Sequence, residues 1–146
     1  NNQYETTEEI SLVAITKKYL RLFEEFINEK QLTVKTTFNG EFTIKLHPIL
    51  ADSLITNLLG NAVKYNYNGG NIERIVSANN YHISNTSMLK PISTEKLFRR
   101  LNTSKDSNER SNGLGLAIVK KIADVNHLEI SYHAQDGVHS FDIMKV

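Results

Sequence analysis

The chain of 146 residues is long enough for one domain with a hydrophobic core, since 40% of its residues are hydrophobic and 23% are charged. Its 17 basic and 16 acidic residues nearly cancel, so no global field favours nucleic acid or an anionic membrane as a partner. The absence of cysteine excludes disulfides, thiol nucleophiles and thiolate metal sites, and no apolar run approaches the length of a membrane span.

The first predicted element is a long amphipathic helix. Residues 1–8 are polar, and apolar side chains then recur at steps of three and four residues up to about Glu29, which is the spacing of one helical face. The residues that set this spacing are Leu12, Ile15, Tyr19, Leu22, Phe23, Phe26 and Ile27. We therefore expect a single helix to open the fold.

Two half-buried strands are predicted next, at 32–38 and 42–46, because apolar and polar residues alternate in both. Asn39-Gly40 lies between them. A two-residue turn would place the two apolar rows on opposite faces, whereas a three-residue loop pairs Phe38 with Phe42 and aligns the rows. We therefore expect a hairpin with a three-residue loop.

The remaining elements follow from the same two periodicities. Pro48 suits the first position of a helix, and Asp136-Gly137 predicts a tight turn between the last two strands. Residues 102–112 contain no apolar side chain, so we expect that segment to be mobile. In chain order we expect a helix over 48–65, strands over 72–77 and 81–84, helices over 93–101 and 114–125, and strands over 128–132 and 141–143. This order predicts an α+β fold: a two-layer sandwich with a mixed, mostly antiparallel sheet and its helices on one face.

A polar stripe marks the predicted helix over 48–65. Asn57, Asn61 and Lys64 share one face at 100° per residue, and no acid occurs from residue 53 to 66. A solvated face would favour Glu, Gln, Lys or Arg, because Asn lies about 0.5 kcal/mol behind Ala in helix propensity. The stripe is either such a solvated face or a set of amides that faces a metal, a phosphate or a buried network.

A second signal is "SNGLGLAIVKK", where Gly113 and Gly115 precede an apolar helix. Glycine lets backbone amides approach a ligand closely, and the unpaired amides of a first helical turn suit a phosphate group. An ordinary glycine-rich start of a helix would look the same. The conjunction with the asparagine stripe favours the phosphate interpretation.

The asparagine helix, two strands, a polar segment and "GLGLAIV", in that order, resemble the ATP-binding catalytic domain of sensor histidine kinases. That family belongs to a superfamily with DNA gyrase, the ninety-kilodalton heat-shock chaperone and the mismatch-repair ATPases. The resemblance covers roughly residues 10–146 and implies a Bergerat-type ATP-binding fold, with 1–9 as the tail of a linker from an upstream dimerisation domain. The family's N box, "NLLxNAxKY", is matched at every specified position, by Asn57, Leu58, Leu59, Asn61, Ala62, Lys64 and Tyr65.

The resemblance implies ATP and Mg²⁺ as cofactors. Asn61 is expected to ligate the metal ion between the nucleotide phosphates, with Lys64 and Tyr65 beside the phosphate chain. Hydrolytic members of the superfamily carry a water-activating glutamate at the position of Asn57, and an amide cannot act as a general base. Asn57 therefore argues against an ATP hydrolase and for an enzyme that holds ATP until a protein nucleophile arrives. Asn57, Lys64 and Arg100 are the expected catalytic residues.

The glycine boxes of the family are only partly matched. The first usually has Asp, which receives the adenine amino group, and then Gly two residues later; here Asn85 and Ser87 stand in those places. Asn85 can still accept that hydrogen bond through its carbonyl oxygen. The second box, "GxGLGL" in the family, has Ser111 at its first glycine. The residues expected to contact the phosphates there are Gly113, Leu114, Gly115 and Leu116.

A segment before the polar loop, "KLFRRLN", resembles the family's F box, with Phe98 matched and Leu101 in place of the second aromatic residue. Phe98 is also explained by plain core packing. Arg100 and Lys105 are expected to reach the terminal phosphate when the segment closes over the nucleotide.

The resemblance also predicts partners. The five histidines lack metal-ligand spacing and the context of a phosphoacceptor, so the acceptor histidine is expected on a dimerisation domain before residue 1. The isolated chain should then bind ATP without phosphorylating itself. In the full-length protein we expect a homodimer, a response regulator as partner, and a cytoplasmic position below an inner-membrane sensor, with no nucleic acid and no direct membrane contact by this domain.

The predicted function is therefore donation of the ATP terminal phosphoryl group to a histidine in two-component signal transduction. The alternative is a degenerate module of the same fold that acts in protein–protein binding, with Asn85, Ser87 and Ser111 as signs of lost nucleotide affinity.

Overall fold

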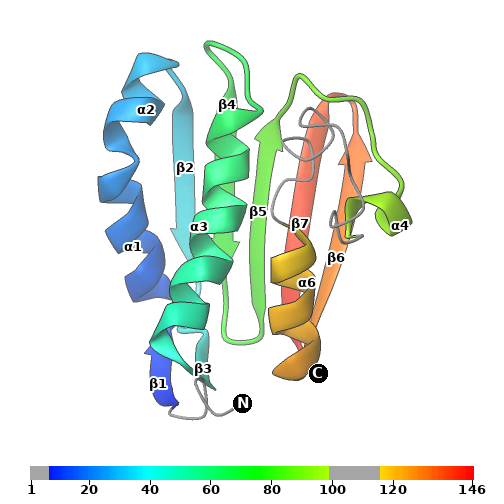
Figure 1. Cartoon of the computed structure of the whole chain (residues 1–146). Helices are drawn as coiled ribbons and strands as arrows, with labels where there is room; N and C mark the ends of the chain where they lie inside the picture. The colour runs from blue at the N-terminus through cyan, green and yellow to red at the C-terminus, as the bar shows by residue number, and fades with distance from the viewer. Residues whose placement is uncertain (1–6, 99–115) are drawn as a thin grey trace.

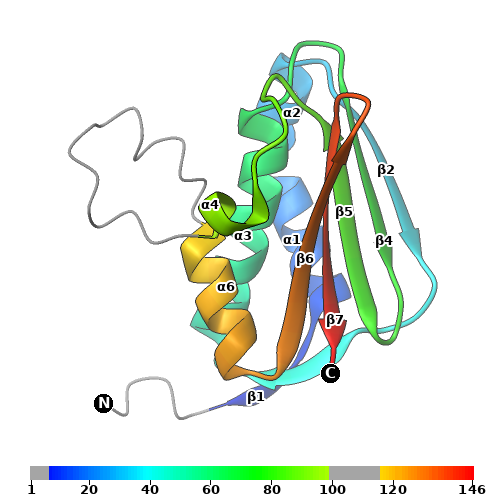
Figure 2. The ribbon, with the colours of Figure 1, turned by 90° about the vertical axis from the view of Figure 1, so that its right-hand side faces the viewer.

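The computed structural model describes residues 7–98 and 116–146, which form two layers (Figure 1). A five-stranded sheet makes one layer, and the helices lie together on one of its faces, as Figure 2 shows from the side. The predicted α+β sandwich is confirmed. The helices are α1 (Leu12–Leu22), α2 (Glu24–Glu29), α3 (Pro48–Lys64), α4 (Thr94–Leu97) and α6 (Leu116–Val125); the strands are β1 (Glu8–Ser11), β2 (Thr33–Phe38), β3 (Thr43–Leu46), β4 (Asn71–Val76), β5 (Asn80–Thr86), β6 (Leu128–Gln135) and β7 (Val138–Lys145).

The five-stranded sheet has the order β2-β4-β5-β7-β6. β2 runs parallel to β4, and all other neighbours in this sheet are antiparallel, so the expected mixed sheet is found. β4 and β5 pair as a hairpin, and the predicted hairpin of β6 with β7 forms. Asp136 and Gly137 have φ values of 54° and 78°, the left-handed pair that a two-residue hairpin turn needs.

Helix α3 crosses the middle of the sheet and matches its predicted bounds to within one residue (Figure 1). His47 precedes it as N-cap, its Nδ1 accepting from the backbone nitrogen of Ile49 at 3.1 Å, and Pro48 occupies the first helical position. Its apolar face packs into the core through Ala51, Leu54, Ile55, Leu58, Leu59, Ala62 and Val63. Within residues 7–98 and 116–146, no helix combines the length and apolar character needed to cross a membrane.

The prediction of one long first helix is wrong at its start and in its middle. Ser11 caps α1 by accepting from the backbone nitrogen of Ala14 at 3.2 Å, and the residues before it form β1, which pairs with β3. The helix is also interrupted at Phe23, between α1 and α2. Leu22 and Phe26 are 62% and 55% exposed, although both were expected to face the core. The spacing of apolar residues over several turns indicates which face of a helix is buried, but it does not detect an interruption of one residue.

The predicted hairpin of β2 and β3, with its three-residue loop, does not form. β2 pairs with β4 and β3 pairs with β1. The backbone nitrogen of Asn39 donates to the carbonyl oxygen of Val76 at 2.8 Å, and a Cβ on Gly40 would lie 3.2 Å from the backbone nitrogen of Ala78. Asn39-Gly40 therefore packs against the β4–β5 turn and does not reverse the chain. Alternation identifies a strand but not its partner.

Three other predictions, for residues 93–101, 102–112 and 114–125, extend beyond the described residues. Helix α4 is shorter than the predicted 93–101, and Ser93 caps it by accepting from the backbone nitrogen of Lys96 at 3.3 Å. Residues 99–101 and the segment 102–112, expected to be mobile, lie outside the described part of the chain.

Candidate functional site

Helix α3 presents Asn57, Asn61 and Lys64 on the side opposite its buried face, as predicted. Asn57 and Asn61 are half-buried, and Lys64 is exposed, with Nζ 5.2 Å from the centroid of the Tyr65 ring. The amide nitrogen of Asn57 donates to the carbonyl oxygen of Ser53, one turn earlier, at 2.7 Å. That bond, with a second from the same nitrogen to Ser53 Oγ at 3.3 Å, directs the donors of Asn57 to its own helix, and its amide oxygen is an acceptor and not a base.

The C-terminal end of α3 is held by a lysine from α2's end. Tyr65 and Asn66, which follow the helix, are buried. Nζ of Lys30 donates to the carbonyl oxygens of Val63, Lys64 and Asn66 at 2.9, 2.8 and 3.1 Å. These include carbonyls that the helix leaves unpaired, and a cation there also complements the helix dipole. The end of the helix that carries the expected phosphate-binding residues is thus fixed.

Asn66 ties this end of α3 to the end of β5. Its Oδ1 accepts from Thr86 Oγ1 at 2.6 Å, and its Nδ2 donates to the carbonyl oxygens of Ala62 and Asn71, both at 3.1 Å. A Cβ on Gly70 would collide with the side chains of Asn66 and Thr86, so only glycine fits beside this pair. The two segments expected to hold the nucleotide are therefore joined by a buried hydrogen-bond network.

Asn85 and Ser87 lie on either side of that junction, and both are buried. Nδ2 of Asn85 donates to the carbonyl oxygen of Thr86 at 2.8 Å, which leaves Oδ1 as the acceptor that an adenine amino group requires. The backbone nitrogen of Met88 donates to the carbonyl oxygen of Tyr65 at 2.9 Å. The structure thus brings Tyr65 close to the Asn85–Ser87 segment.

Of the second glycine box, the described part of the chain includes only Leu116. Leu116 begins α6 and is fully buried, and α6 packs against α3 in the opposite direction (Figure 1). The N-terminus of α6 therefore points toward the end of the molecule at which α3 finishes. The predicted site residues outside the described part of the chain are Arg100, Lys105, Gly113, Leu114 and Gly115, together with Ser111. Phe98 packs edge to face on Phe141, with ring centroids 6.5 Å apart, which agrees with a core role.

Sequence reasoning missed four residues around this site: Asn66, Thr86, Tyr132 and His139. Asn66 directly follows the N box, and that position was the available signal. His139 shares the alternation of Phe141 and is therefore inward-facing, 6% exposed. Testing the five histidines only for metal-ligand spacing does not reveal that His139 lies on the buried face of its strand.

The donor set around α3 fits magnesium only when a nucleotide is bound with it. Among residues 7–98 and 116–146, no cluster of three or more His, Asp or Glu side chains is arranged to hold a metal ion. The expected ligand, Asn61, would offer only a neutral amide oxygen. Magnesium prefers oxygen ligands, keeps several waters and is usually held by few protein groups plus substrate phosphates. Such an ion would therefore depend on the phosphates for its negative ligands.

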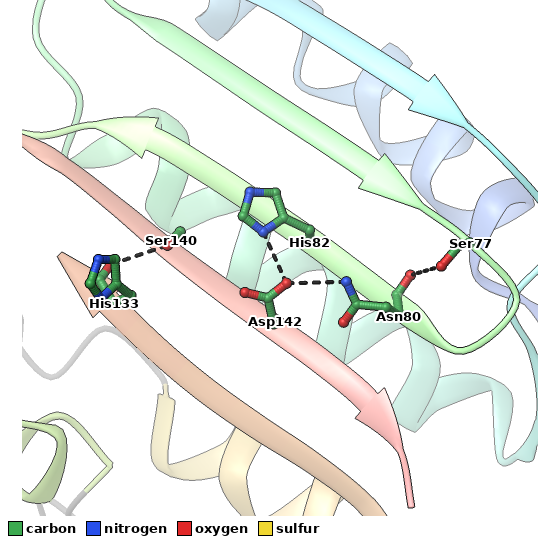
Figure 3. Close-up of polar contacts among 6 residues, drawn as sticks. All are labelled: Ser77, Asn80, His82, His133, Ser140 and Asp142. Atoms are coloured by element: carbon green, nitrogen blue, oxygen red, sulfur yellow. Dashed lines mark hydrogen bonds and ion pairs between the residues drawn. The ribbon is translucent and has the colours of Figure 1, made fainter. Parts of the chain in front are cut away.

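A different polar cluster lies on the face of the sheet away from the helices (Figure 3). His82 Nδ1 and Asp142 Oδ1 are 2.9 Å apart, and Asn80 Nδ2 donates to the same oxygen at 3.2 Å. Ser140 Oγ donates to the carbonyl oxygen of His133 at 3.2 Å. These contacts link neighbouring strands and stabilise the pairing. They lie on the opposite side of the sheet from α3.

Comparison with known proteins agrees with this geometry. Residues 46–143 match the family described as "Histidine kinase-, DNA gyrase B-, and HSP90-like ATPase". The heme sensor protein HssS of Staphylococcus aureus (strain Newman) is 34% identical to the chain, over 94% of the chain and 35% of that protein. The sensor protein QseC of Escherichia coli (strain K12) is 26% identical, over 75% of the chain and 25% of that protein. The chain thus spans about a third or less of these relatives.

Solved structures show the same fold. The catalytic domain of histidine kinase ThkA superposes with a TM-score of 0.76 at 24% identity, covering 96% of this chain and 98% of that one. The cytoplasmic segment of histidine kinase QseC superposes with a TM-score of 0.74 at 19% identity, covering 99% of this chain and 81% of that one.

Proposed function

Because the chain belongs to the family of histidine kinase-, DNA gyrase B- and HSP90-like ATPases, we propose that it binds ATP with Mg²⁺ for phosphoryl transfer to a histidine on a separate domain. One observation carries this proposal. The Asn66–Thr86 and Tyr65–Met88 hydrogen bonds join the asparagine helix to the strand end that carries Asn85. Residues suited to the phosphates and to the base are thus joined by hydrogen bonds, and phosphoryl transfer depends mainly on such positioning.

Each predicted residue has a role in this proposal. Asn61 supplies an amide oxygen to Mg²⁺, while Lys64 and Tyr65 lie beside the phosphate chain. Asn85 accepts from the adenine amino group through Oδ1, and Ser87 holds the turn that follows. The backbone of Gly113, Leu114, Gly115 and Leu116 contacts the phosphates, and Arg100 and Lys105 reach the terminal phosphate. Bound Mg²⁺ would neutralise phosphate charge.

The transfer step requires little acid–base chemistry from this chain. The bond between the terminal phosphorus and the bridging oxygen breaks, a phosphorus–nitrogen bond to the acceptor imidazole forms, and ADP leaves. The imidazole releases its N–H proton to solvent or to a base on its own domain. Asn57 cannot deprotonate water, because its side chain is a neutral amide whose nitrogen donates to Ser53. The site therefore holds ATP for a protein nucleophile and does not hydrolyse it rapidly.

The wider setting is proposed from the relatives. HssS and QseC are sensor proteins, and the chain covers only a part of each. Histidine kinase ThkA has been solved in complex with the response regulator protein TrrA. We accordingly propose that this domain lies in the cytoplasm as part of a homodimeric sensor. The phosphoacceptor histidine would lie on a preceding domain, and the phosphorylated histidine would pass its phosphoryl group to a response regulator.

Thermal unfolding of the chain with ATP, with and without Mg²⁺, tests nucleotide binding. At about 100 times its dissociation constant, a ligand adds about 2.7 kcal/mol of stability. Asn61→Ala should lose the Mg²⁺-dependent part of that gain. Asn28→Ala, an exposed asparagine in α2, is the matched control and should retain it. Neither change disfavours the helix, since Ala exceeds Asn in helix propensity. Equal shifts in both variants would refute the assignment of Asn61.

Phosphoryl transfer needs a second assay, because nucleotide binding alone also fits a binding module. The chain is incubated with γ-labelled ATP and the histidine-bearing dimerisation domain of the full-length protein. We expect label on that domain, stable to alkali and labile to acid. Normal nucleotide binding without transfer would favour the degenerate binding module, for which the buried Ser87 in place of glycine is the supporting observation.

A further inference from the structure

A strap of residues, Ser87–Ile92, connects the end of β5 to α4, and two side chains from the last hairpin hold it. His139 on β7 is 6% exposed, and its Nε2 lies 3.0 Å from the carbonyl oxygen of Leu89. Its Nδ1 lies 3.0 Å from the hydroxyl of Tyr132 on β6. The backbone nitrogen of Ile92 donates to the same hydroxyl at 3.3 Å. The His139–Tyr132 pair thus holds two backbone groups of the strap.

The partners fix the proton positions. A carbonyl oxygen only accepts, so His139 Nε2 carries a hydrogen and donates to Leu89. In neutral imidazole Nδ1 is then an acceptor, and the Tyr132 hydroxyl donates to it while accepting from Ile92. Every polar atom in this chain of bonds has a partner when His139 is neutral. Burial lowers the pKa of His139 and raises that of Tyr132, although bonds to Leu89 and Ile92 oppose these shifts, so both groups stay in the required form.

The strap adjoins the proposed nucleotide site at its first residues. Asn85, the expected adenine partner, lies directly opposite His139 in the pairing of β5 with β7. Met88 bonds to the carbonyl oxygen of Tyr65 at the end of α3. The backbone nitrogen of Ser87 also donates to the carbonyl oxygen of Gly137 at 3.1 Å, so the strap is attached to the end of α3 at one point and to the last hairpin at three others.

We propose that His139 and Tyr132 are positioning residues for nucleotide binding, which hold the strap so that Asn85 and the end of α3 face the nucleotide together. This inference rests on the proposed function. Neither side chain is expected to touch ATP. Both act by keeping the strap ordered before the ligand arrives, which lowers the entropy lost on binding.

Tyr132→Phe gives the sharpest test, because it keeps the ring, which packs 5.1 Å from that of Phe141, and removes only the hydroxyl. We expect the dissociation constant for Mg-ATP, measured by calorimetry, to rise on the order of tenfold, as the loss of one or two hydrogen bonds implies. Exchange of the Ile92 amide hydrogen should quicken in the free protein and slow again with nucleotide. Tyr19→Phe, on α1, is the matched control and should change neither quantity.

His139→Gln and His139→Leu complete the series. Gln can still donate to Leu89, so it should restore part of the affinity that Leu loses. If His139→Leu fails to fold, Tyr132→Phe and His139→Gln still decide the matter. If the wild type binds Mg-ATP and Tyr132→Phe binds it with the same affinity, this inference is overturned and the proposed function is left intact. Failure of the wild-type chain to bind Mg-ATP would overturn the proposed function, and this inference with it.

Discussion

The hydroxyl of Thr86 lies 2.6 Å from Oδ1 of Asn66, and this contact joins the last residue of β5 to the end of α3. The same hydroxyl accepts from the backbone nitrogen of Asn71 at 2.8 Å. Asn66 is 1% exposed, so water cannot replace a lost partner.

Thr86→Val should therefore destabilise the protein by about 1 kcal/mol, because it removes the hydroxyl that bonds to both Asn66 and Asn71, although Asn66 Oδ1 still accepts from the backbone nitrogen of Tyr67 at 3.0 Å. Urea unfolding measures the loss. Thr33→Val, at an exposed position of the edge strand β2, should change stability by less than about 0.5 kcal/mol. If the two variants unfold at the same urea concentration, the junction has no special role. If Thr86→Val binds Mg-ATP more weakly than the wild type and Thr33→Val does not, the junction of Asn66 with Thr86 supports the nucleotide site.

Lys30→Met should cost about 1–2 kcal/mol, since it removes the cation that binds three carbonyl oxygens at the C-terminus of α3. Lys35→Met is the control. Its ammonium lies 3.9 Å from Glu73 on the surface, where an ion pair contributes about 0–1 kcal/mol. Chemical denaturation at low and high salt separates the two, because the carbonyl bonds of Lys30 should depend less on salt. Equal losses would contradict this account of the helix end.

Arg74→Met should stabilise the protein by about 1–3 kcal/mol. Arg74 on β4 is fully buried, its Nε and Nη1 have no hydrogen-bond partner among the described residues, and Nη2 donates to Thr36 Oγ1 at 3.3 Å. Burial lowers its pKa, while the neighbouring Tyr81 opposes that shift. A buried cation without a carboxylate is costly, and Met fills a similar volume. Arg74→Lys keeps the charge and should not stabilise. A lower urea midpoint for Arg74→Met would disprove the prediction.

The stability of the protein should fall in mild acid partly because of His139. Burial lowers its pKa in the folded state below the ordinary value of 6.5, and the bond to Leu89 opposes the shift without cancelling it. The unfolded chain therefore binds a proton first as the pH falls. The contribution of neutral His139 to the free energy of unfolding is complete above pH 6.5. It is lost progressively as the pH falls through the folded-state pKa.

Urea midpoints measured between about pH 8 and pH 5 should thus decline more steeply in the wild type than in His139→Gln, which has no titrating group there. His133→Gln, at an exposed position of β6, should follow the wild type. Parallel curves for the wild type and His139→Gln would show that the folded-state pKa is not lowered.

Local signals in the sequence predicted the parts of the site that lie on one continuous element. The stripe of Asn57, Asn61 and Lys64 depends only on helical spacing, and Pro48 and the polar residues after Tyr65 mark the ends of that helix. The turn at Asp136-Gly137 is likewise local, because those residue types favour positive φ. The roles of residues 99–115 remain predictions.

The amino-acid sequence by itself determined most of the helices and strands, apart from β1 and the interruption at Phe23, and which face of α3 is polar, since these follow from the spacing of side chains along one element. Only the tertiary structure decided that β2 pairs with β4, that α1 ends at Leu22, and that His139 reaches the strap. These features depend on contacts between residues far apart in the chain. Backbone hydrogen bonds and packing are satisfied by whichever partner the whole fold brings near, and no local periodicity specifies that partner.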